Sequence, residues 1–176
     1  MIVDNFVDYV KLTVKSGKGG KGSTHLRREK YVPKGGPDGG DGGDGGSIIV
    51  VGDSNLWTLQ SFRFKKHFKA GNGGDGGGSK KSGLTGKNIF IKVPLGTIVK
   101  ETITEKTLFE INSDKEEIVL LKGGKGGLGN AHFKSPTNQT PRYSQSGLPG
   151  QELQITLELK ILADVGLVGY PNVGKS

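Results

Sequence analysis

Residues 34–46 read Lys-Gly-Gly-Pro-Asp-Gly-Gly-Asp-Gly-Gly-Asp-Gly-Gly, a stretch that repeats every three residues. Asp38, Asp41 and Asp44 occupy one phase of the repeat, and glycines fill the other two. A period of three fits neither an α-helix nor a pleated strand, but it fits polyproline II, which has three residues per turn and no internal hydrogen bonds. The sequence therefore predicts a rod with one edge of Asp side chains and two edges of bare backbone that can pair with neighbouring rods.

Three other glycine tracts, at residues 17–22, 71–78 and 123–129, have a similar spacing. Taken alone, each tract would read as a flexible linker, because glycine-rich chains are usually coils. Their recurrence between strand-like segments favours a different structure, in which the tracts are rods that pack side by side.

Composition sets limits on the fold and on the compartment. Of 176 residues, 32 are glycine and only 32% are hydrophobic, so we expect a small core supplemented by backbone hydrogen bonds between glycine segments. The chain contains no Cys, which fits a reducing cytoplasm. The first ten residues lack the basic start of a signal or transit peptide, and no apolar run approaches the roughly 20 residues that span a bilayer. We therefore expect a cytoplasmic protein without a membrane span.

The positive charge is concentrated in the N-terminal part of the chain. The formal net charge is +8, and the first hundred residues hold 17 Lys and Arg against 8 Asp and Glu. This asymmetry indicates a polyanionic partner for the N-terminal part. We expect the basic segments, which are residues 18–21, 27–34, 80–87 and 134–142, to form loops that gather at the tips of the rods.

Between the glycine tracts the sequence alternates apolar and polar residues at the period of a β-strand. Strands are predicted at residues 10–15, 47–51, 88–93, 97–101, 107–111, 117–121 and 151–160. Their spacing indicates an antiparallel barrel or sandwich. Residues 62–69 interleave aromatic and basic side chains, and we interpret them as a strand with Phe62 and Phe64 in the core rather than as rings that stack on bases.

The last sixteen residues have a different character. An apolar run at residues 161–168 predicts a buried parallel strand, and it leads into Gly-Tyr-Pro-Asn-Val-Gly-Lys-Ser at residues 169–176, the pattern of a phosphate-binding loop. In such a loop the backbone N–H groups surround phosphates, the lysine neutralises them and the Ser hydroxyl is a ligand of Mg²⁺. The predicted nucleotide-binding residues are Gly169, Tyr170, Pro171, Asn172, Val173, Gly174, Lys175 and Ser176, with Ser176 as the metal ligand. The alternative is a chance match in a glycine-rich chain.

No helix, switch region or base-recognition motif follows Ser176. We therefore expect the chain to be the front part of a longer protein, and we expect this part alone to bind nucleotide poorly and to hydrolyse none.

Several segments together resemble the N-terminal domain of the Obg GTPases, also called CgtA, a family of ribosome-associated GTPases. They are Leu-Arg-Arg-Glu-Lys-Tyr-Val-Pro-Lys-Gly-Gly-Pro at residues 26–37, the Gly-Gly-Asp repeats, and residues 62–70, 91–97, 122–130 and 157–176. The resemblance implies the Obg fold: a mainly β protein whose small barrel or sandwich carries left-handed polyproline-II-type helices. Residues 1–159 would form this domain, and residues 160–176 would be the first strand and phosphate-binding loop of a truncated α/β G domain.

The resemblance also implies a function. The family binds GTP and GDP with Mg²⁺, hydrolyses GTP, associates with the large ribosomal subunit during its assembly and takes part in stress and growth control, so stress-response regulators are further partners; we expect a monomer. Its N-terminal loops reach rRNA, and this chain would provide only that rRNA-facing part. The rRNA-binding candidates carried onto this chain are Arg27, Arg28, Lys30, Lys34, Lys80, Lys81 and Arg142.

Two other classes of function remain open from the residues alone. One is a non-enzymatic scaffold that contacts a protein partner through Asp38, Asp41 and Asp44. The other is the front part of an ATP-using phosphate-loop protein, since guanine and adenine are distinguished by residues beyond Ser176.

Overall fold

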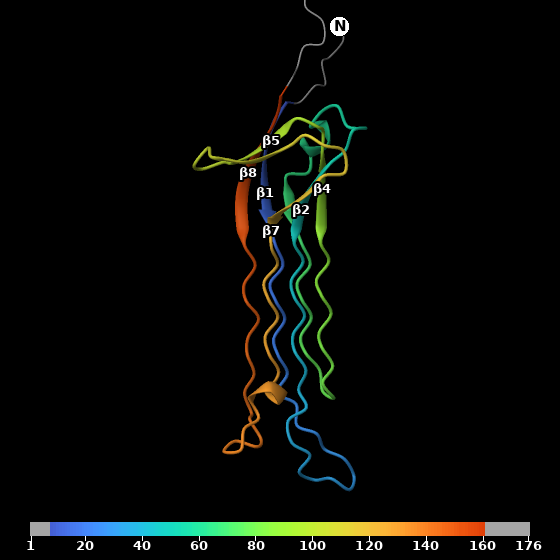
Figure 1. Cartoon of the computed structure of the whole chain (residues 1–176), viewed down its shortest axis with the longest axis vertical. Helices are drawn as coiled ribbons and strands as arrows, with labels where there is room; N and C mark the ends of the chain where they lie inside the picture. Colours follow the sequence, from blue (N-terminus) through green and yellow to red (C-terminus); the bar gives the residue numbers. More distant parts are fainter. Residues whose placement is uncertain (1–7, 161–176) are drawn as a thin grey trace, which may run out of the picture.

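The computed structural model describes residues 8–160, which form a β-sandwich and a long projection (Figure 1). These residues contain eight strands and two short 3₁₀ helices, η1 and η2. The strands are β1 (Tyr9–Lys15), β2 (Ile48–Gly52), β3 (His67–Lys69), β4 (Ile89–Val93), β5 (Thr97–Glu101), β6 (Thr107–Ile111), β7 (Glu117–Leu121) and β8 (Glu152–Leu159). The 3₁₀ helices are η1 (Gln60–Phe62) and η2 (Asn130–Phe133). The predicted strand at residues 161–168 and the phosphate-binding loop at residues 169–176 lie outside the described residues.

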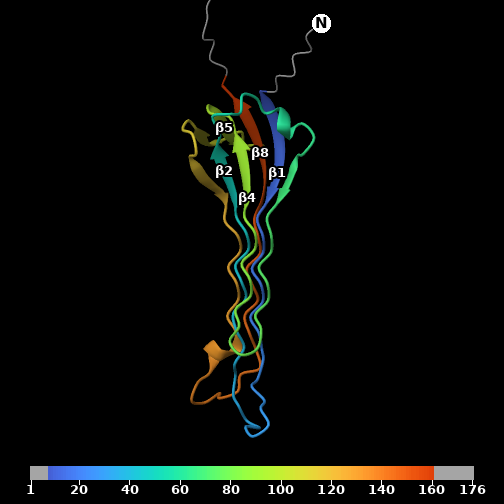
Figure 2. The ribbon, with the colours of Figure 1, turned by 90° about the vertical axis from the view of Figure 1, so that its right-hand side faces the viewer.

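The sandwich consists of a five-stranded sheet in the order β3-β1-β8-β5-β6 and a three-stranded sheet in the order β4-β2-β7. Of the two predicted alternatives, a barrel or a sandwich, the structure shows the sandwich; the prediction of antiparallel pairing is wrong for two pairs, because β1 pairs with β3 and β2 with β4 in parallel. The projection explains the exceptions. β1 and β3 both lead into it and β2 and β4 both return from it, so each pair runs in one direction (Figure 2).

One hydrophobic core lies between the two sheets. In β1 the alternation places Val10, Leu12 and Val14 in the core and leaves Lys11 and Lys15 exposed. The other sheet contributes mainly Ile48, Val50, Ile91, Val93 and Leu121. The core is therefore small and confined to the sandwich, as the low hydrophobic content predicts.

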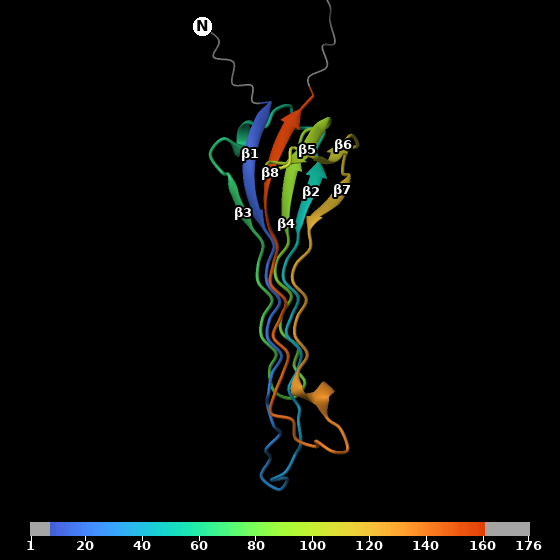
Figure 3. The same cartoon turned by 90° about the vertical axis from the view of Figure 1, so that its left-hand side faces the viewer.

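The projection consists of six segments without helix or strand structure, which run side by side away from the sandwich (Figure 3). We name them rods 1 to 6: residues 16–25, 37–47, 70–78, 80–88, 122–129 and 142–151. Four of them contain the predicted glycine tracts. Rods 4 and 6 correct the sequence interpretation, which placed residues 80–87 and much of 135–150 in loops.

Hydrogen bonds between rods repeat every three residues. In rod 2 the N–H groups of Gly40, Gly43 and Gly46 donate to rod 3, at N···O distances of 2.7–2.8 Å. The N–H groups of Gly42 and Gly45, which belong to the preceding phase, donate to backbone carbonyls of rod 5 at N···O distances of 2.8 Å. The third phase consists of the Asp residues. Their backbone carbonyls accept hydrogen bonds from N–H groups of rod 4. Each phase of rod 2 thus faces a different neighbour, which confirms that the glycine tracts pack side by side.

The Asp residues of rod 2 are bound within the projection and do not form a free acidic edge. Asp38 is only 8% exposed. One carboxylate oxygen of Asp41 accepts the N–H of Gly129, and one of Asp44 accepts the N–H of Gly126, both at 2.7 Å. The carboxylates therefore satisfy rod 5 donors that no backbone carbonyl reaches.

The interpretation of residues 62–69 as one strand is wrong. Phe62 ends η1 and is buried, whereas Phe64 is 88% exposed, and the strand begins only at His67. The interruption changes the phase of the side chains, so the two Phe rings do not share a face.

Candidate nucleic-acid interface

The distal end of the projection, which we call the tip, is formed by two loops. The first connects rods 1 and 2 and is a narrow hairpin: Leu26 bridges Pro37, and Glu29 bridges Val32. The N–H of Arg27 donates to the carbonyl of Gly36 at 3.0 Å. Gly36 has φ +69°, a left-handed conformation that glycine adopts without steric cost. The basic residues of this loop are thus held on an ordered hairpin.

The second tip loop connects rods 5 and 6 and contains η2. Asn130, fully buried at the start of η2, joins the two loops. Its Oδ1 accepts the N–H of Gly39 at 2.8 Å, and its Nδ2 donates to the carbonyls of His25 and Pro141 at 2.9 and 3.1 Å. Because this one amide bonds to rods 1 and 2 and to the second loop, it fixes the two loops against each other.

A groove of about 410 Å³ lies between the two tip loops. Four of its lining residues are the cations Arg27, Arg28, Lys34 and Arg142. Arg27 is paired with Glu29, at 2.8 Å between Nη2 and Oε1. Within residues 8–160, the other three cations have no carboxylate within ion-pair distance. The groove therefore presents a concentrated positive charge to solvent at the end of the projection.

The structure brings together four of the seven predicted rRNA-binding residues in this groove. Lys30 lies at the turn of the first hairpin, outside the groove lining, with its Nζ 5.6 Å from the ring centre of the exposed Tyr31. Lys80 and Lys81 lie where rod 3 turns into rod 4. The prediction that all basic segments gather at the tip is therefore only partly correct: residues 18–21 and most of 80–87 belong to the rods.

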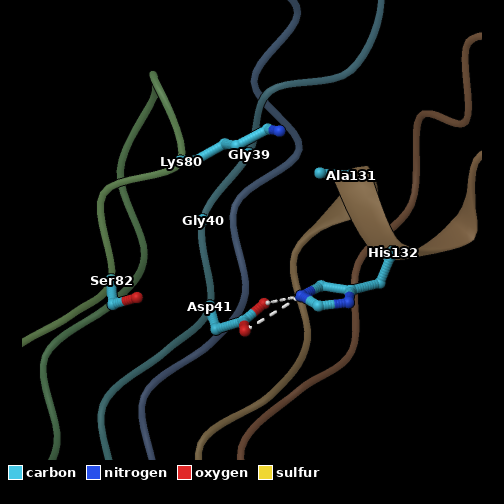
Figure 4. A pocket seen from close by; sticks show the side chains of 7 residues that line it. All are labelled: Gly39, Gly40, Asp41, Lys80, Ser82, Ala131 and His132. Atoms are coloured by element: carbon cyan, nitrogen blue, oxygen red, sulfur yellow. Dashed lines mark hydrogen bonds and ion pairs between the residues drawn. The ribbon is translucent and has the colours of Figure 1, made fainter.

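A second, smaller cavity of about 190 Å³ opens on the side of the projection near the tip (Figure 4). Its lining includes Asp41, Lys80, Ser82 and His132, and the His132 ring points at the Asp41 carboxylate, with Nε2 3.0 Å away. The His132–Asp41 pair cross-links η2 to rod 2. Its position suits a structural contact between rods, and sequence reasoning did not single out His132.

A similar pair joins rods 1 and 2 beside the tip. Nδ1 of His25 lies 2.5 Å from Oδ1 of Asp38, and the N–H of Ser79 donates to Oδ2 at 3.1 Å. The hydrogen bond to His25 holds the pKa of the Asp38 carboxyl below its usual value, against the opposing effect of burial. Asp38 thus stays ionised in a largely buried position because rod 1 and the turn between rods 3 and 4 supply partners for its carboxylate.

The described residues show no grouping of three or more His, Cys, Asp or Glu side chains that would hold a metal ion. No helix among them is long and apolar enough to cross a membrane. What the tip offers chemically is cation and hydrogen-bond donors on a fixed frame, which suits recognition of a polyanion.

The fold and this surface define a class of protein: a β-sandwich with a bundle of glycine rods that ends in a basic groove. A family model described as GTP1/OBG matches residues 7–161. The chain belongs to this family.

Named relatives agree with the family model. The chain is 64% identical to GTPase Obg of Flavobacterium johnsoniae over 176 residues, which is all of this chain and 53% of that protein. It is 53% identical over the same span to GTPase Obg of Parabacteroides distasonis, covering 46% of that protein. GTPase Obg of Thermodesulfovibrio yellowstonii is 56% identical over 171 residues, 97% of this chain and 51% of the relative. The chain thus spans about half the length of these curated relatives.

Proposed function

We propose that this chain is the N-terminal part of a GTP-binding protein that hydrolyses GTP, and that its projection binds the rRNA of the large ribosomal subunit during assembly. Residues 1–159 would be the Obg domain, and residues 160–176 the start of the GTP-binding domain. The name of the relatives, GTPase Obg, supports GTP as the nucleotide. By itself the chain would be the RNA-facing part and would not catalyse hydrolysis.

The observation that carries the RNA proposal is the groove of Arg27, Arg28, Lys34 and Arg142 at the end of the projection. Cations of this kind neutralise backbone phosphates, and the released counterions make such binding steeply dependent on salt. A-form RNA exposes phosphates and 2′-hydroxyls but hides its major groove, so proteins read it mostly by shape. A rigid tip with fixed cations suits that mode of recognition.

The rods would hold the tip at a distance from the sandwich. We infer that they are left-handed polyproline-II-type helices, because most of their backbone hydrogen bonds go to neighbouring rods and these repeat every three residues. At about 3.1 Å per residue, a nine-residue rod would extend roughly 28 Å beyond the sandwich. The tip would then enter a crevice in the subunit that the sandwich is too wide to enter.

The nucleotide site rests on the sequence of residues 169–176. Lys175 would neutralise phosphate charge, the backbone around Gly169 and Gly174 would surround the phosphates, and Ser176 would hold Mg²⁺. Bound Mg²⁺ would neutralise charge on the phosphate oxygens. Loops that order around the γ-phosphate would then control how the domain binds the subunit. A cytoplasmic monomer that also contacts stress-response regulators is part of the same proposal.

Co-sedimentation with purified large subunits tests the RNA proposal. The double variant Arg28→Glu with Arg142→Glu reverses two unpaired groove cations, and Lys92→Glu with Lys106→Glu, which reverses two exposed lysines of the sandwich, is the matched control. We expect the groove double variant to bind about tenfold or more weakly at moderate salt. The slope of log K against log salt concentration should become shallower by about two. Equal binding of the double variant and the control would refute the role of the groove.

The two alternatives are less well supported. A scaffold that binds through Asp38, Asp41 and Asp44 would have to compete with hydrogen bonds that these carboxylates already make inside the projection. A phosphate-loop protein with an unrelated N-terminal module conflicts with the family match over residues 7–161.

A further inference from the structure

Besides the tip, the sandwich carries a second basic surface that includes exposed aromatic rings. It lies beside β3, the edge strand of the five-stranded sheet, and its neighbour β1 (Figure 3). We call it the flank and define it by Tyr9, Lys11, Arg63, Phe64 and Lys66. Four of these residues, all except Phe64, line a hollow of about 390 Å³. The rods separate the flank from the groove at the tip.

The cations of the flank have no acidic partners. Within residues 8–160, no carboxylate lies within ion-pair distance of Lys11, Arg63 or Lys66. Lys11 and Tyr9 also border a neighbouring hollow that contains Glu101, Glu105 and Glu158, and of these Glu158 pairs with Lys100 at 2.5 Å. The flank therefore has its least compensated positive charge at Arg63 and Lys66, on the side away from that hollow.

Aromatic rings stand among these cations. Phe64 is 88% exposed, and the Arg63 guanidinium carbon lies 5.8 Å from the centre of its ring. Tyr9 is 52% exposed at the hollow. Covering an exposed apolar ring with a partner would gain free energy. A flat ring beside unpaired cations is the combination that binds a nucleotide, with the base on the ring and the phosphate on the cations.

Protection of a sheet edge is the simplest structural explanation for basic residues beside β3. It accounts for Lys69 and His67, which lie on the strand itself. It does not account for Arg63 and Lys66, which precede the strand, or for the outward-facing Phe64. β3 has only three residues, so its edge offers little to protect.

We propose that the flank is a second RNA site, which binds a single-stranded or unpaired nucleotide by stacking its base on Phe64 and holding its phosphates with Lys11, Arg63 and Lys66. The proposal goes beyond the tip contact and rests on the proposed function only for RNA as the partner class. The hollow has a volume in the range of small-ligand sites, so one nucleotide with its sugar fits beside Tyr9. Stacking does not depend on base identity, so we expect little sequence preference.

The 176-residue chain and a fluorescent twelve-nucleotide single-stranded RNA without secondary structure provide the test, with binding followed by fluorescence anisotropy at low and moderate salt. Phe64→Ala removes the stacking ring, and Phe90→Ala removes a half-exposed ring from β4 on the other sheet as the matched control. We expect at least a fivefold loss for Phe64→Ala and none for Phe90→Ala. The double variant Arg63→Glu with Lys66→Glu should weaken binding further and reduce its salt dependence.

The tip variant, Arg28→Glu with Arg142→Glu, separates the two sites. It should bind the single strand nearly normally while losing the large subunit. Loss of single-strand binding in the tip variant with no loss in Phe64→Ala would overturn the flank proposal and leave the tip proposal intact. Failure of the parent chain to bind the oligonucleotide, with capture of an acidic peptide instead, would also overturn it and would assign the flank to a protein partner.

Discussion

Two adjacent glycines in rod 3 have different surroundings, although both lie within the projection. A Cβ added to Gly76 would lie 2.1 Å from the carbonyl oxygen of Gly40 in rod 2, which is backbone and does not rotate away. A Cβ added to Gly77 would meet only Lys81, its Cβ at 3.4 Å and its carbonyl oxygen at 3.8 Å, which are ordinary contacts. Gly76→Ala and Gly77→Ala therefore make the same chemical change at neighbouring positions with opposite steric consequences.

The cost of Gly76→Ala follows from the movement it requires. To restore a normal carbon–oxygen contact, rods 2 and 3 must separate by about 1 Å or more. If rod 3 moves outward, two of its hydrogen bonds of 2.8 Å break: the one from Gly40 N–H of rod 2 to Gly77 O, and the one from Gly76 N–H to Lys21 O of rod 1. At about 1 kcal/mol net for each bond and 1–3 kcal/mol for a donor left unpaired, the loss is about 3–5 kcal/mol. Reduced freedom of the unfolded chain offsets about 0.4–1 kcal/mol.

Urea unfolding followed by circular dichroism measures this difference. With a slope of about 2 kcal/mol/M, we expect Gly76→Ala to lower the midpoint by roughly 1–2 M and Gly77→Ala to leave it unchanged or raise it slightly. If only the projection opens, hydrogen exchange at Gly40 and Gly43 will accelerate while the sandwich amides stay protected. Identical midpoints and identical exchange in the two variants would refute the packing of the rods.

Three further predictions concern polar contacts within the projection. Asp41→Ala should cost about 1–3 kcal/mol, because it leaves the buried Gly129 N–H without an acceptor, whereas Asp41→Asn keeps the acceptor; urea unfolding of the pair checks this. Asn130→Ala should accelerate hydrogen exchange in both tip loops, since it removes three hydrogen bonds at once, and unchanged exchange in either loop would contradict its joining role. Because the folded-state pKa of Asp38 is lowered, its contribution to stability is present above the unfolded-state value of about 4 and is lost as pH falls through the folded-state pKa. When stability is measured as a function of pH in the acid range, His25→Ala should reduce the stability that is lost on acidification. An unaltered acid profile would show that the His25–Asp38 pair does not cause that loss.

The sandwich strands were predictable because their signal is local. β5, β6 and β7 have the bounds that alternation and turn residues predict. The parallel pairs were not predictable in the same way, because they depend on the direction in which the chain returns from the projection. Residues 62–69 show the same limit: interleaved rings and cations look like a strand, and only the 3₁₀ turn at η1 reveals that Phe64 faces solvent.

Rods 4 and 6 were missed although the sequence contains a weak signal for them. Gly83 and Gly86 in rod 4, and Gly147 and Gly150 in rod 6, are each three residues apart. A Cβ on Gly83 would lie 1.9 Å from the carbonyl oxygen of Gly74 in rod 3, and one on Gly147 would lie 2.1 Å from that of Gly19 in rod 1. A rod at the periphery has one inner edge, so only one residue in three must be glycine. Rod 2 bonds to rods 1, 3, 4 and 5, which explains why two of every three residues in its repeat are glycine.

The register of the rods also explains how the groove at the tip is assembled from residues far apart in the sequence. Going from the sandwich to the tip, rod 1 bonds to rod 6 through Ser16 with Gln151, Gly19 with Leu148 and Gly22 with Gln145. Advancing three residues along rod 1 therefore corresponds to going back three residues along rod 6. Continuing the same register by three residues places residue 25 opposite Arg142, close in the chain to Arg27 and Arg28.

The pairing of rods 1 and 2 advances in the same way. Gly17 bonds to Gly46, Gly20 to Gly43 and Ser23 to Gly40, and the next step is the observed bridge between Leu26 and Pro37. A single period of three therefore sets the packing of the rods and also the position at which the cations of both loops meet. Inserting or deleting one residue in rod 6 would break this register, rotate the rod by one phase and move Arg142 out of the groove. Inserting three residues would restore the phase, so the two insertions should differ sharply in large-subunit binding, and equal binding would show that register does not position the groove.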